Sequence, residues 1–288
     1  MPYTPGISLG GLSATLGSVA LGTVDASGVA WVLQTLEGWD SPDVRAEFTD
    51  REGDHGAWAS PVYLGSRPIT LAGTIVAPSQ ALLEAAMEQL RAAAGLTDTQ
   101  LTVWETLPKQ CTVRRSGKVL LQYVTDVTAS YSVMVTAEDP RRYGTTQQSG
   151  VTGLPVTTGG LTFPAAVPFA FSASGATGTI AAANAGTVET RPVLTVAGPV
   201  VAPLVSALYP DGTVRQLAYS QTLQSGEQLV IDTDARTVLL NGVSRRRFLS
   251  VPAGWPTIPA ASTVTYQFQS GTYSASASLT ATWRSAWM

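Results

Sequence analysis

The chain has 288 residues, of which 44% are hydrophobic and only 13% carry a charge, and its formal net charge is −3. The length suits two ordinary domains, each with its own core. Charged residues make up about 25% of a typical soluble domain, so the low fraction favours a subunit whose surface is covered by other protein. The single cysteine, Cys111, excludes an internal disulfide and a thiolate metal cluster, and the single histidine, His55, allows at most one histidine-dependent catalytic triad.

The charges are divided unevenly along the chain. Residues 1–148 carry 15 acidic and 10 basic side chains, and residues 149–288 carry 5 and 7, so the first part is net −5 and the second +2. Neither part has the dense run of basic side chains that nucleic-acid binding requires. The sequence also lacks the roughly 20 consecutive apolar residues of a transmembrane helix, and its first residues show no signal-peptide pattern.

The first half predicts strands and one helix. A β-branched and aromatic run predicts a strand at 29–36, and a second strand is predicted at 67–77. The next segment predicts a helix over 79–94, with Ser79 as its N-cap and Gly95 just past its end. Its apolar residues recur at helical spacing and form one stripe that we expect to pack on a sheet. The stripe consists of Leu82, Leu83, Ala86, Met87, Leu90 and Ala94.

After the helix, four more strands are predicted at 101–105, 110–114, 118–123 and 127–138. The dipeptide Ser116–Gly117 predicts a hairpin turn between the second and third of them. A stretch without charge and rich in Gly and Thr then predicts an extended connection. We therefore expect a first domain at 1–148, a linker at 149–162 and a second domain at 163–288.

The second half is predicted to be all β. Short segments alternate polar with apolar residues and are separated by turn signals such as Pro210-Asp211-Gly212 and Asn241-Gly242, which is the pattern of a β-sandwich or jelly roll. No helix of useful length is predicted there. The strands are expected at 169–172, 177–183, 193–196, 214–217, 228–231, 237–240, 263–269 and 275–283.

The densest polar cluster is the segment 50–56, Asp50-Arg51-Glu52-Gly53-Asp54-His55-Gly56. Its alternating acids resemble a calcium loop, but no bidentate glutamate follows at the required distance and the glycine is misplaced. No nucleophile motif accompanies the histidine. We interpret the segment as a surface loop joining two strands, and we expect no catalytic residue, no metal and no cofactor in the chain.

Two features of the second half are candidate contacts for a carbohydrate or a partner protein: Trp255, and the run Arg245, Arg246 and Arg247. A tryptophan on a β-sandwich can stack on a sugar ring, although aromatic side chains more often fill a core or an interface. Three adjacent arginines usually make a solvated edge or a partner contact, and a nucleic-acid role needs more basic residues nearby. A carboxylate pair for glycoside hydrolysis is hard to exclude from sequence, but Asp211 and Asp234 sit in turn signals that explain them.

Several segments, taken in their order and spacing, resemble the distal tail proteins of siphophages. In the first half the resemblance rests on 36–42 (Leu-Glu-Gly-Trp-Asp-Ser-Pro), on 50–56, on 67–75 and on the exit segment 137–143 (Ala-Glu-Asp-Pro-Arg-Arg-Tyr). In the second half it rests on 189–192, 229–233, 241–242 and the terminal 283–287 (Trp-Arg-Ser-Ala-Trp). The resemblance covers nearly the whole chain.

This resemblance implies a mainly β protein, with an N-terminal β-sandwich flanked by a helix and a hairpin and a C-terminal galectin-like β-sandwich. It implies a structural virion protein made in the host cytoplasm, whose first domain forms a homohexameric ring. The ring would be the hub at the tail tip and would contact the tail tube protein, the tape-measure protein and the tail-tip or receptor-binding protein. DNA would only pass through its channel, and no membrane would be entered. The family offers no catalytic residues to transfer, and a galectin-like fold alone does not imply sugar binding.

Three other functions remain open at this point. The first is a carbohydrate-binding adhesin module of the tail tip, which would use Trp255. The second is a tail-tip hydrolase, which the scarcity of histidine and the missing nucleophile motif disfavour. The third is a major tail-tube protein, whose chain usually lacks so large a second β domain.

Overall fold

The computed structural model describes residue 9, residues 11–156 and residues 177–288. The chain divides into two compact units, one of residues 1–145 with 287–288 and the other of residues 146–286. Each unit has a separate hydrophobic core. The strand predicted at 169–172 and positions 157–162 of the predicted linker lie outside the described residues.

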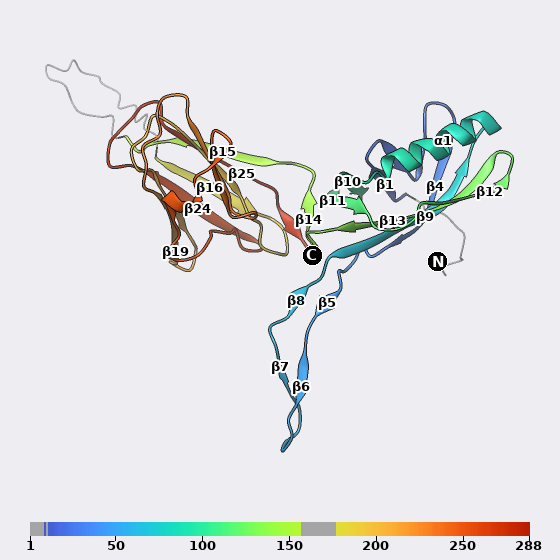
Figure 1. Ribbon diagram of the computed structural model, residues 1–288, viewed down its shortest axis with the longest axis horizontal. Coiled ribbons are helices and arrows are strands. Elements are labelled where there is room, and N and C mark those ends of the chain that lie inside the picture. Colours follow the sequence, from blue (N-terminus) through green and yellow to red (C-terminus); the bar gives the residue numbers. More distant parts are fainter. Residues whose placement is uncertain (1–8, 10, 157–176) are drawn as a thin grey trace, which may run out of the picture. The chain divides into compact units, whose positions relative to one another are not determined.

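The first unit consists of one large sheet, a helix and a projecting hairpin (Figure 1). In chain order its elements are β1 (Ser13–Leu16), β2 (Val19–Leu21), β3 (Thr23–Val24), β4 (Ala30–Glu37), β5 (Val44–Arg45), β6 (Phe48–Asp50), β7 (Ala57–Ala59), β8 (Tyr63–Leu64), β9 (Arg67–Val76), α1 (Gln80–Ala93), β10 (Thr99–Trp104), β11 (Lys109–Arg115), β12 (Leu120–Thr125), β13 (Thr128–Ala137) and β14 (Arg142–Gly144). The short strand β26 (Ala286–Trp287), near the end of the chain, pairs with β14.

The large sheet curls around the first core. Its strands follow the order β2-β1-β10-β11-β13-β9-β4-β3. The two ends of this path, β2 and β3, are separated in the chain only by Gly22, whose amide bonds to the Trp31 carbonyl on β4. Along β9, every second side chain is buried in the core, as the predicted strand pattern requires. Ile69, Leu71 and Ile75 are among these buried residues.

The predicted helix is confirmed as α1. The side chain of Ser79 accepts a hydrogen bond from the Leu82 amide, as expected of an N-cap, and the helix ends at Ala94. The predicted stripe faces the core, with Leu83, Met87 and Leu90 buried. Among the described residues, no helix is both long and apolar enough to cross a membrane.

The predicted hairpin at Ser116–Gly117 is wrong. Strands β11 and β12 do not pair with each other, because both pair with the long strand β13 at different heights. Arg115 lies opposite Val135, whereas Leu120 lies opposite Ser132. The chain does turn at Ser116–Gly117, but the turn leads from the stretch of β13 that pairs with β11 to the stretch that pairs with β12. The hairpin beside the sheet is instead formed by β12 and β13.

The second unit is a pair of antiparallel sheets around the second core. Its elements are β15 (Gln148–Gly153), β16 (Thr179–Asn184), β17 (Val193–Ala197), β18 (Leu204–Leu208), β19 (Val214–Tyr219), β20 (Gln228–Asp232), β21 (Thr237–Leu240), β22 (Val243–Ser244), the 3₁₀ turn η1 (Arg246–Phe248), β23 (Leu249–Ser250), β24 (Ser262–Gln269) and β25 (Ser278–Trp283). One sheet has the order β15-β25-β17-β20-β21-β22, and the other has the order β16-β24-β18-β19-β23. The mainly β fold class predicted from the sequence is confirmed.

The first part of the predicted linker is instead a strand. Residues 148–153 form β15, which pairs with β25 over its whole length, for example Val151 with Thr280. The Gly- and Thr-rich composition suggested a loose connection, but a strand can use such residues when its partner supplies the hydrogen bonds. The division between the units falls at residues 145 and 146, close to the predicted end of the first domain.

Candidate functional site

A long hairpin leaves the sheet of the first unit between β4 and β9, and we call its residues 44–64 the arm (Figure 1). Two short ladders hold it together: Val44 and Arg45 pair with Leu64 and Tyr63, and the three residues of β6 pair with those of β7. The arm is two strands wide throughout, since β5 pairs only with β8 and β6 only with β7, and it contains no helix. Isolated two-stranded hairpins are at best marginally stable in water, so the arm needs a further surface to pack on.

The arm exposes large apolar side chains on both of its faces. Five residues of the arm are each more than half exposed: Val44, Phe48, Trp58, Val62 and Tyr63. Phe48 lies opposite Ala59, and Trp58 lies opposite Thr49, one residue further along the ladder. Because successive residues of a strand point to opposite faces, Phe48 and Trp58 project from opposite sides of the arm. Exposed apolar groups of this size mark an interaction surface.

The polar segment 50–56 forms the tip of the arm, as the predicted loop between two strands requires. The guanidinium of Arg51 lies 4.4 Å from the centroid of the Trp58 ring, and the Asp54 carboxylate accepts a hydrogen bond from the His55 amide. Within the described residues, no group of three or more histidine, cysteine, aspartate or glutamate side chains is arranged to hold a metal ion. The arm carries four acids and two arginines over residues 44–64, a net charge of −2.

The root of the arm is held by Arg67, whose side chain is completely buried. Its Nε donates to the Pro140 carbonyl at 2.8 Å, and its Nη1 donates to the carbonyls of Gly38 and Trp39 at 3.1 and 2.7 Å. Burial, together with the nearby charge of Arg142, lowers the pKa of Arg67. The guanidinium of Arg67 thus links the start of β9 to the residues that follow β4 and to the residues that follow β13.

Gly38 is required at this root for two reasons. Its φ is +77°, a conformation that costs other residues strain. A Cβ at this position would also lie 1.9 Å from the Pro68 carbonyl oxygen, so no side chain fits. The chain therefore turns from β4 toward the arm at a point that only glycine can occupy.

A second polar cluster surrounds Trp39, beside the root. Its indole N–H donates to the Glu105 carboxylate at 2.7 Å, which also accepts from the Lys109 ammonium at 2.6 Å. Burial raises the pKa of Glu105, but the hydrogen bonds from Lys109 and Trp39 outweigh it, so that the pKa is lowered overall. The Arg142 guanidinium lies 5.3 Å from the centroid of the Trp39 ring, and the Lys109 ammonium lies 5.7 Å from that of Trp287. These contacts make the cluster a structural network in which Glu105 is held by two donors.

Cys111 lies within the core of the first unit, in the middle of β11. Burial raises the pKa of its thiol to about 12. A thiol in this state is protonated at neutral pH and is a poor nucleophile. Cys111 therefore serves as a small buried hydrophobic residue of the core, as free cysteines commonly do.

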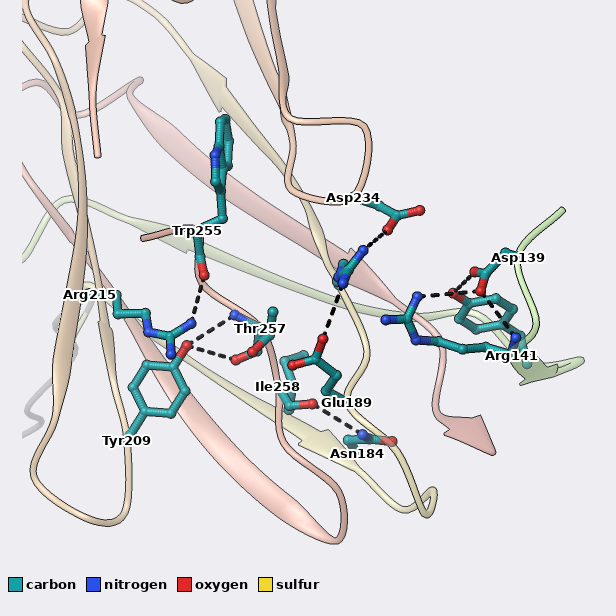
Figure 2. A network of polar contacts seen from close by, with 12 residues as sticks. Asp139, Arg141, Asn184, Glu189, Tyr209, Arg215, Asp234, Trp255, Thr257 and Ile258 are labelled. Carbon is teal, nitrogen blue, oxygen red and sulfur yellow. Dashed lines mark hydrogen bonds and ion pairs between the residues drawn. The ribbon is translucent and has the colours of Figure 1, made fainter. Parts of the chain in front are cut away.

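In the second unit, Trp255 is partly buried against the second core. The guanidinium of Arg246 lies 5.0 Å from the centroid of its ring, and the Trp255 carbonyl accepts a hydrogen bond from Arg215. Figure 2 shows this bond together with the Tyr209 hydroxyl, which bonds to both the amide and the carbonyl of Thr257. The structure thus brings Trp255 and Arg246 together, with the guanidinium over the ring.

The acids of the second unit that might have formed a catalytic pair have structural partners. Arg191 bonds to both Asp234 and Glu189, at 2.6 and 3.2 Å (Figure 2). The carboxylate of Asp211 accepts from the Thr213 amide, and that of Asp232 accepts from the amides of the following turn. The turn role predicted for Asp211 is confirmed, whereas the carboxylate of Asp234 pairs with Arg191 and the turn around it is held by Asp232.

The family model of the siphovirus-type tail component, C-terminal domain, matches residues 185–287. The Dit protein of phage SPP1, described as a paradigm of the hub adsorption apparatus in phages that infect Gram-positive bacteria, has a similar structure, with a TM-score of 0.65 at 12% identity over 96% of this chain and 99% of that one. Two structures of the phage p2 baseplate in its activated conformation, with Ca and with Sr, have TM-scores of 0.51 and 0.52 at 10% and 11% identity, over 94% of this chain and 97% of theirs. No curated protein sequence matches the chain.

The second unit thus matches the C-terminal domain of siphovirus-type tail components, and the fold of the chain is that of the Dit protein of phage SPP1. These matches confirm the resemblance to siphophage distal tail proteins that was noted in the sequence. The proteins with this fold are a phage hub protein and components of a phage baseplate.

Sequence reasoning missed two features of the site. Of the arm, the sequence predicted only the loop 50–56 between two strands, because the strands of the arm have two or three residues each and show no period. The role of Arg67 was not foreseen, because its acceptors are backbone carbonyls that follow no residue pattern. The one signal available was an arginine at the head of a strand that is otherwise apolar on alternate positions.

Proposed function

We propose that the chain is the distal tail hub of a siphophage, a homohexameric ring that joins the tail tube to the tail-tip and receptor-binding apparatus. The first unit forms the ring, and the second is a galectin-like β-sandwich that offers binding surface to other tail proteins. The tail tube protein, the tape-measure protein and the tail-tip or receptor-binding protein are its partners, and DNA passes through the channel without binding. The chain is made in the host cytoplasm, acts in the virion and catalyses no reaction.

The exposed apolar side chains of the arm are the observation that supports a ring. Fully burying one large apolar side chain contributes about 1.5–3 kcal/mol, and the arm offers five such side chains that its own unit leaves exposed. Two arms packed against each other would bring net charges of −2 together, which disfavours a symmetric arm-to-arm contact. The arm therefore suits a different surface of the next copy, and head-to-tail contacts of this kind close into rings.

Labelling virions with gold tests the position of the hub. A tag placed after Met288 and decorated with gold should mark the end of the tail distant from the head. Gold distributed along the tail shaft would contradict the hub and favour a tube protein. Untagged virions treated in the same way are the control for adventitious gold.

A further inference from the structure

An arginine-rich segment closes one side of the second unit. The amide of Arg245 bonds to the Val238 carbonyl, which extends the pairing of β22 with β21. The chain then makes the turn η1 and enters β23, where Leu249 pairs with Tyr219 of the other sheet. The segment therefore crosses from the edge of one sheet to the edge of the other, and it places three consecutive arginines on the crossing.

Two of these arginines are held against aromatic rings. Arg246 lies over Trp255 and also donates to the Leu249 carbonyl at 2.8 Å. Arg247 lies over the ring of Phe248, 4.5 Å from its centroid. Such contacts orient a guanidinium and cover the ring at the same time. The surface therefore presents cationic groups in place of free aromatic faces.

No carboxylate neutralises these arginines within the described part of the second unit. The ion pairs found there join Arg191 to Glu189 and Asp234, and none involves residues 245–247. In a chain with 13% charged residues, three adjacent unpaired cations are a concentrated charge. A surface of this kind selects an acidic partner.

The crossing lies beside an open strand edge. Strand β22 ends the order of its sheet, so one side of its backbone has no neighbouring strand. Val243 on this strand is 56% exposed. An open edge with an exposed apolar residue is the surface to which an extended chain adds by backbone pairing.

We propose that β22 and the arginines 245–247 together bind an extended acidic segment of another polypeptide, which adds to the sheet as a strand. The proposal rests on the hub function, since the segment would belong to another tail protein. A polypeptide fits better than a glycan because only a polypeptide pairs with a strand edge, and because guanidinium groups already lie over the rings of Trp255 and Phe248. Nucleic acid fits poorly because the whole unit carries a net charge of only +2.

The test uses the full chain and a short fluorescent peptide that alternates glutamate with valine, with binding followed by fluorescence anisotropy. We expect saturable binding that weakens by about tenfold in R245E/R247E, since charge reversal at a contact costs at least that much. Arg246 is kept because it also donates a hydrogen bond to the Leu249 carbonyl and so helps to hold the turn. The matched control R91E/R114E reverses two exposed arginines of the first unit and should bind as the wild type does. Thermal unfolding of each variant verifies that the fold is retained.

A second peptide separates strand addition from simple charge attraction. Its valines are replaced by proline, which keeps the charge but removes backbone donors, and we expect it to bind about tenfold more weakly. Equal binding of both peptides, equal loss in the two double variants, or displacement by inorganic polyphosphate at equal charge would each overturn the proposal. If the chain forms rings that bind no peptide, the peptide proposal fails and the hub proposal stands. If the chain is a monomer that binds the peptide, the hub proposal fails and the peptide proposal stands.

Discussion

Replacing Arg67 by methionine should lower the free energy of unfolding of the first unit by about 3 kcal/mol. The change removes the donors for three carbonyls at the arm root, those of Gly38, Trp39 and Pro140. A hydrogen bond from a charged group contributes about 1.5–3 kcal/mol, and the methionine leaves all three acceptors unpaired. Part of this loss is offset, since the cost of burying the guanidinium also disappears.

Urea unfolding followed by tryptophan fluorescence measures this effect. Arg67→Lys should fall between the wild type and Arg67→Met, because an ammonium keeps the charge but lacks the planar fork that reaches three carbonyls. The control is Arg114→Met, whose side chain is exposed and whose ion pair with Asp98 is exposed as well. A loss for Arg67→Met within about 1 kcal/mol of that control would contradict the role assigned to Arg67.

Replacing Phe48 and Trp58 together by serine should convert the ring into monomers. Both side chains are more than half exposed in the chain itself, so their loss should leave the thermal unfolding temperature unchanged. In the assembly each would be buried against the next copy, and truncating a central aromatic contact typically costs about 2 kcal/mol or more. Two such losses at every interface weaken each contact by about a thousandfold.

Sedimentation velocity at several concentrations reads out this change. The control V151S/Y273S removes one aliphatic and one aromatic side chain that are equally exposed on the second unit, and it should still form the ring. If the arm variant assembles as the wild type does, the arm is not the ring contact. If both double variants dissociate, general loss of apolar surface is responsible and the arm has no special part.

The sequence was most informative where periodicity extends over many residues. Strand β9 alternates buried and outward residues over ten positions, and α1 shows an apolar stripe with a capping serine at its start, so both were predictable with nearly correct bounds. The same holds for most strands of the second unit, such as β24. A pattern of this length determines the secondary structure of its segment more strongly than the segments that pack against it.

Pairing between distant segments was not predictable. The chain from β11 to β12 has a good turn signal, yet both strands pair with β13, a choice decided by the length of β13. Strand β15 resembles a linker in composition, and its partner β25 lies about 130 residues further along the chain. Such pairings depend on the core as a whole and leave no local mark in the sequence.

The candidate site divides in the same way. The loop at the tip of the arm and the turn role of Asp211 followed from residue type and spacing. The arm itself did not, because its apolar residues gain their meaning only from their exposure on a two-stranded hairpin. Nor did the contact of Arg246 with Trp255, since the two residues lie on either side of β23 in the chain.

The mass of the purified chain in solution, measured by light scattering with negative-stain images of the same sample, tests the central claim most directly. The hub predicts a mass six times that of the 30.0 kDa chain and closed rings in the images. A monomer at all concentrations, with no rings in the images, would contradict a ring built by the arm of this chain.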